Sequence, residues 1–126
     1  MSYAKDKKTL DDLFSIFIRR RHADSEGYVK CFTCGKIAKW KEMQCGHFQS
    51  RVKLATRWDE INCQVQCVAC NIFGEGNKPA FAGNLVEKFG INILQDLEMK
   101  SFNKFDRGMI GILIKLYQKK LKVYET

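Results

Sequence analysis

Four of the six cysteines form two Cys-x-x-Cys pairs, Cys31 with Cys34 and Cys67 with Cys70. Each pair can fold into a tight turn that presents two thiolates, and two such turns complete a closed tetrahedral zinc site. The N-terminal sequence lacks the apolar region of a secretory signal, so we expect reduced thiols and treat disulfides as the weaker alternative. The sequence therefore predicts a structural Zn²⁺ ion held by these four side chains.

The two pairs are separated by more than the ~15–20 residues that are usual for a simple zinc ribbon. A substantial segment is therefore inserted between them, and it contains the remaining cysteines, Cys45 and Cys63. We interpret both as small buried apolar residues. A pairing of Cys63 with Cys67 stays open as an alternative, although its spacing suits a metal-binding turn less well.

His47 also lies in this insertion and is the histidine better placed for chemistry. His22, the other histidine, follows three arginines at the end of a predicted helix and is expected on the surface. A lone histidine is more often structural, yet its unperturbed pKa of ~6.5 suits an imidazole to general-base catalysis. Asn62 and Asn71 flank the second cysteine pair, and the amide oxygen of Asn71 could bind a hard cation such as Mg²⁺.

Together these residues resemble the HNH, or ββα-metal, endonuclease motif interleaved with a four-cysteine zinc site. An asparagine directly after the last cysteine is similar to the arrangement in recombination endonuclease VII-like enzymes. More closely, the stretch from about Tyr28 to Gly90 resembles the NinG (Rap) family of phage recombination endonucleases. The segments that carry this resemblance are Cys31-x-x-Cys34, Gly46-His47-Phe48, Arg57-Trp58-Asp59-Glu60-x-Asn62, Gln66-Cys67-x-x-Cys70-Asn71 and Gly76-Asn77.

The resemblance implies a metal-dependent, structure-selective DNA endonuclease that acts on branched recombination intermediates such as Holliday junctions and D-loops. Cleavage would leave 5′-phosphate and 3′-hydroxyl ends. By this analogy His47 is the general base, Asn62 holds the loop that orients it, and Asn71 binds the catalytic Mg²⁺ or Mn²⁺. The protein would be encoded by a phage or prophage and work in the cytoplasm of the bacterial host.

One position departs from the general HNH pattern. Many HNH motifs carry Asp, Glu or His just before the catalytic histidine as a second metal ligand, and here that residue is Gly46. The NinG family shares this Gly-His pairing, so it need not indicate an inactive enzyme. Asp59, Glu75 and Asn77 are candidates for the missing ligand, but a solvated turn and a helix stop explain them better.

The chain carries 22 Lys and Arg against 14 Asp and Glu, a formal charge of +8. Such an excess suggests a polyanionic partner, with DNA first, although a merely soluble basic surface is the alternative. No apolar run is long enough for a membrane span, so we expect no membrane association. The excess falls on residues 31–58 and 100–126, which we expect to form the DNA track. The predicted DNA contacts are Arg51, Lys53, Arg57, Lys115, Lys119, Lys120 and Lys122.

Periodicity and turn residues predict a small α+β fold with a metal-stapled centre. We expect one domain, 1–126, made of an N-terminal helical part (1–27), a zinc and HNH core (28–77) and a helical C-terminal part (78–126). In the first part, Thr9 is expected to cap a helix that ends near His22. The core would hold strands at 28–31 and 43–48, a loop at 49–57 and a helix from 68 to about 73. The last part would hold helices at 79–89, 91–100 and 107–124.

Two alternatives remain at this stage. A zinc-stabilised nucleic-acid-binding module without catalysis fits the cysteines and the charge equally well, and His47 with Asn71 is what favours an enzyme. A protein-interaction zinc domain of the RING or LIM kind would need more Cys or His ligands than the sequence contains. An enzyme that cuts two strands is commonly a dimer, and the first or the last helix could supply that interface or simply cover the core.

Overall fold

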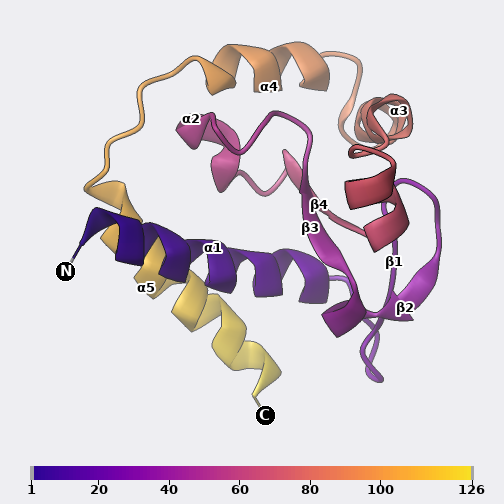
Figure 1. The fold of residues 1–126 in the computed structure, drawn as a ribbon, viewed down its shortest axis with the longest axis horizontal. Coiled ribbons are helices and arrows are strands. Elements are labelled where there is room, and N and C mark those ends of the chain that lie inside the picture. Colours follow the sequence, from indigo (N-terminus) through magenta and orange to yellow (C-terminus); the bar gives the residue numbers. More distant parts are fainter. Residues whose placement is uncertain (1, 126) are drawn as a thin grey trace.

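The structure is a computed structural model that describes residues 2–125. Helices surround two antiparallel two-stranded sheets, β1–β2 and β3–β4, which confirms the α+β class (Figure 1). The elements are α1 (Tyr3–Arg20), β1 (Tyr28–Lys30), β2 (Ile37–Lys39), η1 (Trp40–Glu42), β3 (Gln44–His47), α2 (Leu54–Arg57), β4 (Cys63–Gln66), η2 (Ala69–Phe73), α3 (Lys78–Phe89), α4 (Ile93–Ser101), α5 (Met109–Leu121) and η3 (Lys122–Tyr124).

Helix α1 begins earlier than the sequence predicted. Ser2 is its N-cap and accepts a hydrogen bond from the backbone N–H of Lys5 at 3.1 Å. Thr9 therefore lies inside the helix, where its hydroxyl donates to the carbonyl of Lys5. The expectation that Thr9 caps the helix was wrong because Ser2, an equally good capping residue, precedes a first turn that is already helical.

Helix α1 is the centre of the main core. Its side chains Leu10, Phe14 and Ile18 recur at helical spacing and are buried. Helix α5 crosses one side of α1, and the ring of Tyr117 meets Phe14 edge-on at 5.1 Å between centroids (Figure 1). The β3–β4 hairpin packs against another side of α1. The first and last helices thus cover the core. The predicted 107–124 helix is shorter than expected, because its end tightens into the 3₁₀ turn η3.

The β3–β4 hairpin and the helical turn after it form the centre of the fold. His47 at the end of β3 pairs with Cys63 at the start of β4, and Gln44 pairs with Gln66. All four residues of β4 are buried, and the apolar–polar alternation of Cys63-Gln64-Val65-Gln66 is too short to reveal the strand in the sequence. The segment 49–57, predicted as a loop, contains the short helix α2. A π-helical turn, η2, follows β4 as the predicted helix near 68–73.

Helices α3 and α4 bury a second, separate apolar cluster. Phe81, Leu85, Ile93 and Leu97 form its buried part. Pro79 stands in the first turn of α3 and Gly90, at φ +103°, ends it, as the sequence predicted. Figure 1 shows α4 arching over α2. Within residues 2–125, no helix combines the length and the apolar character that crossing a membrane requires.

Candidate functional site

The four predicted zinc ligands meet at the β1–β2 turn and the start of η2. The sulfur atoms of Cys31, Cys34, Cys67 and Cys70 all lie within 4.8 Å of one another, which places them where they could hold a metal such as zinc. All six cysteines are free thiols. Cys63 lies outside this group and packs into the α1 core, so the structure does not adopt the Cys63–Cys67 pairing.

Hydrogen-bond donors surround these sulfur atoms. The backbone N–H of Cys67 donates to Cys31 Sγ at 3.3 Å, and the Thr33 hydroxyl lies 3.4 Å from the same atom. Burial alone would raise the pKa of Cys31, but these hydrogen bonds lower it to about 6. Asn77 Nδ2 donates to Cys70 Sγ at 3.5 Å. Donors that stabilise a thiolate at Cys31 fit a thiolate-bound zinc. Asn77 therefore serves this centre rather than a second one.

His47 is held in one tautomer by the backbone. Its Nε2 atom lies 2.9 Å from the carbonyl oxygen of Arg57. Because a carbonyl can only accept, Nε2 must carry the proton, and Nδ1 keeps its lone pair. Burial lowers the pKa of His47, and the charges of Arg51 and Arg57 lower it further, against the effect of the Arg57 carbonyl. The imidazole is therefore neutral near pH 7 and able to take up a proton.

Asn62 ties the start of β4 to the segment that orients His47. Its side chain is fully buried. Its Nδ2 donates to the carbonyls of Thr56 at 3.0 Å and Gln49 at 3.1 Å, and its Oδ1 accepts from the N–H of Gln49 at 2.7 Å. Asp59, in turn, accepts from the backbone N–H of Asn62 and is thus a structural residue rather than a solvated one. This network fixes the segment that carries the Arg57 carbonyl.

His47 and Asn71 line the same pocket, which has a volume of about 330 Å³. Asn71 lies on η2, and its Nδ2 donates to Gln44 Oε1 at 2.8 Å. Among residues 2–125 nothing donates to the Asn71 side-chain carbonyl oxygen, so that oxygen remains available to a ligand. Asp11 and Arg51 also line this pocket. The pocket therefore combines a neutral base, an amide oxygen and a wall that carries both arginine and aspartate side chains.

Asp11, from α1, is the pocket residue that sequence reasoning missed as a site residue. Its carboxylate accepts from Arg57 Nη2 at 2.6 Å, Trp58 Nε1 at 2.9 Å and Arg51 Nη2 at 3.1 Å. Burial alone would raise the pKa of Asp11, but the hydrogen bonds and charge of Arg57 bring it below its ordinary value. In the sequence, an acidic residue early in a helix is sufficiently explained by the helix dipole. Nothing local in the sequence marks its partners.

The predicted DNA contacts do not all face solvent. Arg57 is buried, and its guanidinium binds Asp11 and the Arg51 carbonyl, so it positions the pocket wall. Arg51 is exposed and lines the pocket, and Lys53 is exposed with its ammonium over the ring of Phe102. On α5, Lys120 pairs with Glu60 at 2.7 Å.

Three other lysines of α5 and η3 gather around Leu13 of α1: Lys115, Lys119 and Lys122. Ser15 lines the His47 pocket. Leu13 and Ser15 lie two residues apart on α1, so at ~100° per residue their side chains point about 160° apart. The predicted DNA contacts of the two segments thus form two basic surfaces on opposite sides of α1.

Gly46 lets a core side chain approach the backbone closely. A Cβ atom at this position would lie 1.8 Å from Gln66 Oε1, far inside any tolerable contact. Gln66 is fully buried, and its Nε2 donates to Thr33 and to the carbonyl of Gly76. Its Oε1 has no hydrogen-bond partner among the described residues. The position before His47 is therefore filled by the side chain of Gln66 from β4.

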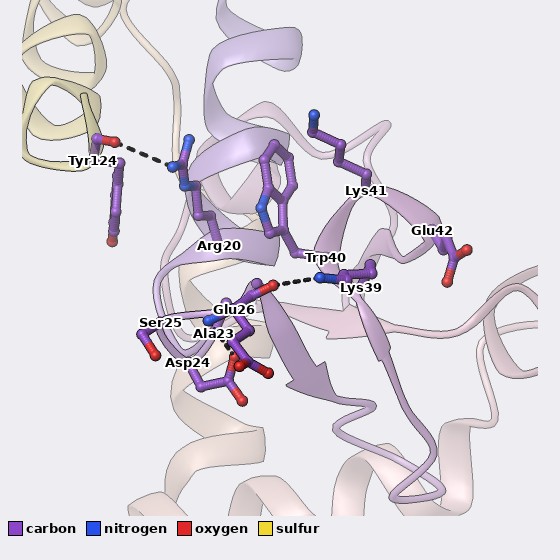
Figure 2. A pocket seen from close by; sticks show the side chains of 11 residues that line it. Arg20, Ala23, Asp24, Ser25, Glu26, Lys39, Trp40, Lys41, Glu42 and Tyr124 are labelled. Atoms are coloured by element: carbon purple, nitrogen blue, oxygen red, sulfur yellow. Dashed lines mark hydrogen bonds between the residues drawn. The ribbon is translucent and has the colours of Figure 1, made fainter. Parts of the chain in front are cut away.

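A cavity larger than the His47 pocket, of about 740 Å³, lies elsewhere, at the C-terminal end of α1. It shares no lining residue with the His47 pocket. Figure 2 shows Arg20 between Trp40 and Tyr124, with its guanidinium 5.1 Å and 4.8 Å from the two ring centroids. Arg20 also donates to the carbonyl of Tyr124. We interpret this hollow as the anchor of the C-terminal segment, because its aromatic faces are already covered.

Comparison with known proteins gives one family. The model described as "Bacteriophage Lambda NinG protein" matches residues 2–126. Protein ninG of Salmonella phage P22 is 31% identical over 94 residues, which are 72% of this chain and 43% of that protein. Protein ninG of Escherichia phage lambda is 28% identical over 94 residues, with the same coverage of each chain. The chain thus spans less than half the length of these relatives, and no solved structure matches it. The family match over nearly the whole chain shows that this protein belongs to the NinG family of bacteriophage proteins.

Proposed function

We propose that this chain is an HNH-type, metal-dependent DNA endonuclease that hydrolyses phosphodiester bonds. The observation that carries the proposal is the hydrogen bond from His47 Nε2 to the Arg57 carbonyl at 2.9 Å. It fixes the tautomer in which Nδ1 is basic, beside an available amide oxygen on Asn71 in the same pocket. A structural histidine needs neither a fixed basic nitrogen nor a neighbour of this kind. The order hairpin, buried Asn62 and helical turn agrees with a ββα-metal finger.

The chemistry of the pocket residues follows from these positions. His47 Nδ1 takes a proton from the attacking water, whose oxygen bonds to phosphorus as the bond to the 3′ oxygen breaks. A 5′-phosphate and a 3′-hydroxyl result. Asn71 would hold Mg²⁺ or Mn²⁺ through its amide oxygen, together with waters and phosphate. When bound, such a cation neutralises charge on the phosphate and the leaving oxygen.

The surroundings of His47 have separate tasks in this proposal. Arg51 binds the phosphate backbone from the exposed rim of the pocket, and Lys53 extends this contact. Arg57 acts indirectly, since Asp11 holds its side chain while its carbonyl orients His47. The four-cysteine centre is structural, because four thiolates leave a zinc ion no open position for substrate.

We further propose that the substrates are branched recombination intermediates, such as Holliday junctions and D-loops, in the cytoplasm of an infected host. Two basic surfaces on opposite sides of α1 support this preference. One duplex arm would lie along Arg51 and Lys53, and a second arm along Lys115, Lys119 and Lys122. A linear duplex engages one of these surfaces at a time.

A cleavage assay tests the proposal. Purified protein is incubated with a labelled four-way junction and Mg²⁺ or Mn²⁺, in parallel with His47→Ala and His22→Ala. We expect nicking by the wild type, a loss of about 10²–10⁴-fold for His47→Ala, and no loss for His22→Ala, whose imidazole is exposed and outside the pocket. A wild type that binds the junction but never nicks it with either metal would instead be a non-catalytic, zinc-stabilised nucleic-acid-binding module.

A further inference from the structure

Three metal-binding side chains share one face of the β3–β4 hairpin. Cys45 and His47 lie two residues apart on β3, so both point to the same side of the sheet. Cys63 is the cross-strand partner of His47 and points to that side as well. The register of the hairpin thus brings two thiols and an imidazole together, away from the four-cysteine centre.

The distances suit a single ion. The two Sγ atoms and a ring nitrogen of His47 all lie within 4.8 Å of one another. Ligand atoms around a tetrahedral zinc, each at ~2.0–2.3 Å from the metal, lie ~3.3–3.8 Å apart. The 4.8 Å limit on the separations is compatible with that spacing. Cys63 is buried and Cys45 is half-buried at the pocket wall, so an ion can enter from the pocket.

We propose that Cys45, His47 and Cys63 form a second metal site, which takes zinc or a similar thiophilic cation and rejects Mg²⁺. Thiolate and imidazole ligands favour such cations, whereas Mg²⁺ requires oxygen. Three protein ligands leave one position of the ion open toward the pocket. The site differs from the four-cysteine centre, which is closed.

Charge balance supports occupation of this buried place. On binding, each thiol releases its proton to the solvent, and His47 binds as the neutral imidazole. Two thiolates neutralise the divalent cation, so no net charge enters the core. Arg21 interacts electrostatically with both cysteines, and its Nε atom is buried without a hydrogen-bond partner among the described residues. The thiolates would therefore face a cation that is already in place.

Occupation has a consequence for catalysis, and this part rests on the proposed function. A His47 ring that binds zinc cannot also accept a proton from water, whichever nitrogen is used. Zinc at this site therefore switches off the Mg²⁺-dependent cleavage, while zinc at the four-cysteine centre is needed for the fold. One metal would then stabilise the chain at low concentration and inhibit it at higher concentration.

Zinc stoichiometry tests the site without any activity. The full chain is reduced with a non-chelating phosphine, saturated with zinc, freed of unbound metal and analysed for zinc per chain. We expect about two ions for the wild type and about one for Cys45→Ser, with a visible Co²⁺ spectrum that changes between the two. Cys63→Ala gives a second check on the same count. One ion in the wild type, or two in Cys45→Ser, would overturn the proposal.

Zinc inhibition tests the consequence. Zinc is titrated into Mg²⁺-dependent junction cleavage by the wild type and by Cys45→Ser, a residue outside the proposed catalytic set. The inhibitory zinc concentration should rise at least about 10-fold in the variant, since loss of even an outer-shell partner costs about 10–100-fold in affinity. Equal inhibition of both proteins contradicts the switch. Absence of any cleavage contradicts the proposed function instead, and the stoichiometry still decides the site.

Discussion

At the scale of single residues, Gly46 shows why a departure from a motif needs a three-dimensional reason. The sequence left open which residue replaces the acidic ligand expected before His47. The structure places Gln66 in that space, so a side chain at position 46 and Gln66 exclude each other. Gln66 could not have been connected to Gly46 in advance, because β4 was not predicted and its register was therefore unknown.

Gly46→Ala should lower the free energy of unfolding by about 1–3 kcal/mol, as overpacking of a core does. The added methyl group would displace Gln66 from Thr33 and Gly76. Gly83→Ala is the matched control, since a Cβ there meets nothing within 4 Å on an exposed turn of α3. It should be neutral or stabilising by up to ~1 kcal/mol. Urea unfolding measures both, and equal stability of the two variants would refute the clash.

Asp11→Asn should destabilise the chain by about 3 kcal/mol near pH 7, because it leaves the Arg57 guanidinium, whose side chain is only 10% exposed, without its charge partner. The pKa of Asp11 in the folded chain lies below its ordinary value of 3.8. Its contribution is therefore complete above that value and is lost as the pH falls through the folded pKa. The difference between wild type and variant should shrink in acid.

The neighbouring variant Asp12→Asn controls for the change of charge, since Asp12 pairs with Lys8 on an exposed surface. It should cost at most ~0.5 kcal/mol. Unfolding free energies measured at several pH values test the comparison. A gap between Asp11→Asn and wild type that stays constant down to strong acid would show that the carboxylate charge is not what stabilises this cluster.

At the scale of elements, helices with a strong apolar periodicity or with clear start and stop residues were predictable. Pro79 and Gly90 marked α3, and the apolar stripe marked α5. Strand β4 was missed because its alternation covers only four residues, and α2 because four residues carry no helical period. Side-chain pairs such as Asp11 with Arg57 join segments far apart in the sequence and give no local signal. The grouping of the four cysteines was predictable because two Cys-x-x-Cys pairs are recognised from short spacing alone.

Removal of zinc should unfold the β1–β2 turn and loosen the hairpin beside it. We expect a strong chelator to lower the unfolding midpoint by roughly 10 °C or more, since structural zinc contributes folding free energy directly. Re-addition of Zn²⁺ should restore the midpoint and Mg²⁺ should not, because four thiolates offer no oxygen ligand. Circular dichroism melts follow both steps, and full rescue by Mg²⁺ would contradict a sulfur-bound centre.

At the scale of the whole molecule, the two segments that the sequence predicts as one DNA track lie on opposite sides of α1. The net charge of each segment could be read from the sequence. Which way its charged side chains face depends on how α5 crosses α1. Lys120 illustrates this, because it turns inward to Glu60 while its neighbours on α5 face out.

Substituting Lys115, Lys119 and Lys122 together by Gln should weaken binding to a four-way junction. The steepness with which the logarithm of the binding constant falls with the logarithm of the salt concentration should decrease by about 2–3. Each lysine that no longer neutralises a phosphate lowers this slope by nearly one. Linear duplex binding should change little, because it can use the other surface. Arg51→Gln with Lys53→Gln should likewise weaken junction binding, while a linear duplex can still use the α5 surface. Fluorescence anisotropy at several salt concentrations measures these slopes. Equal weakening on junction and duplex by the α5 variant would argue for one continuous surface.

The pairing of α1 with α5 also bears on the order in which the chain can mature during synthesis. Helix α1 is synthesised before the residues that cover one side of its apolar stripe, 109–121. His47 and Asn62 are translated before the last two thiols of the metal centre. A nascent chain therefore holds neither a finished core nor a finished pocket, and DNA cutting, if the proposed function holds, must wait until translation of these segments is complete.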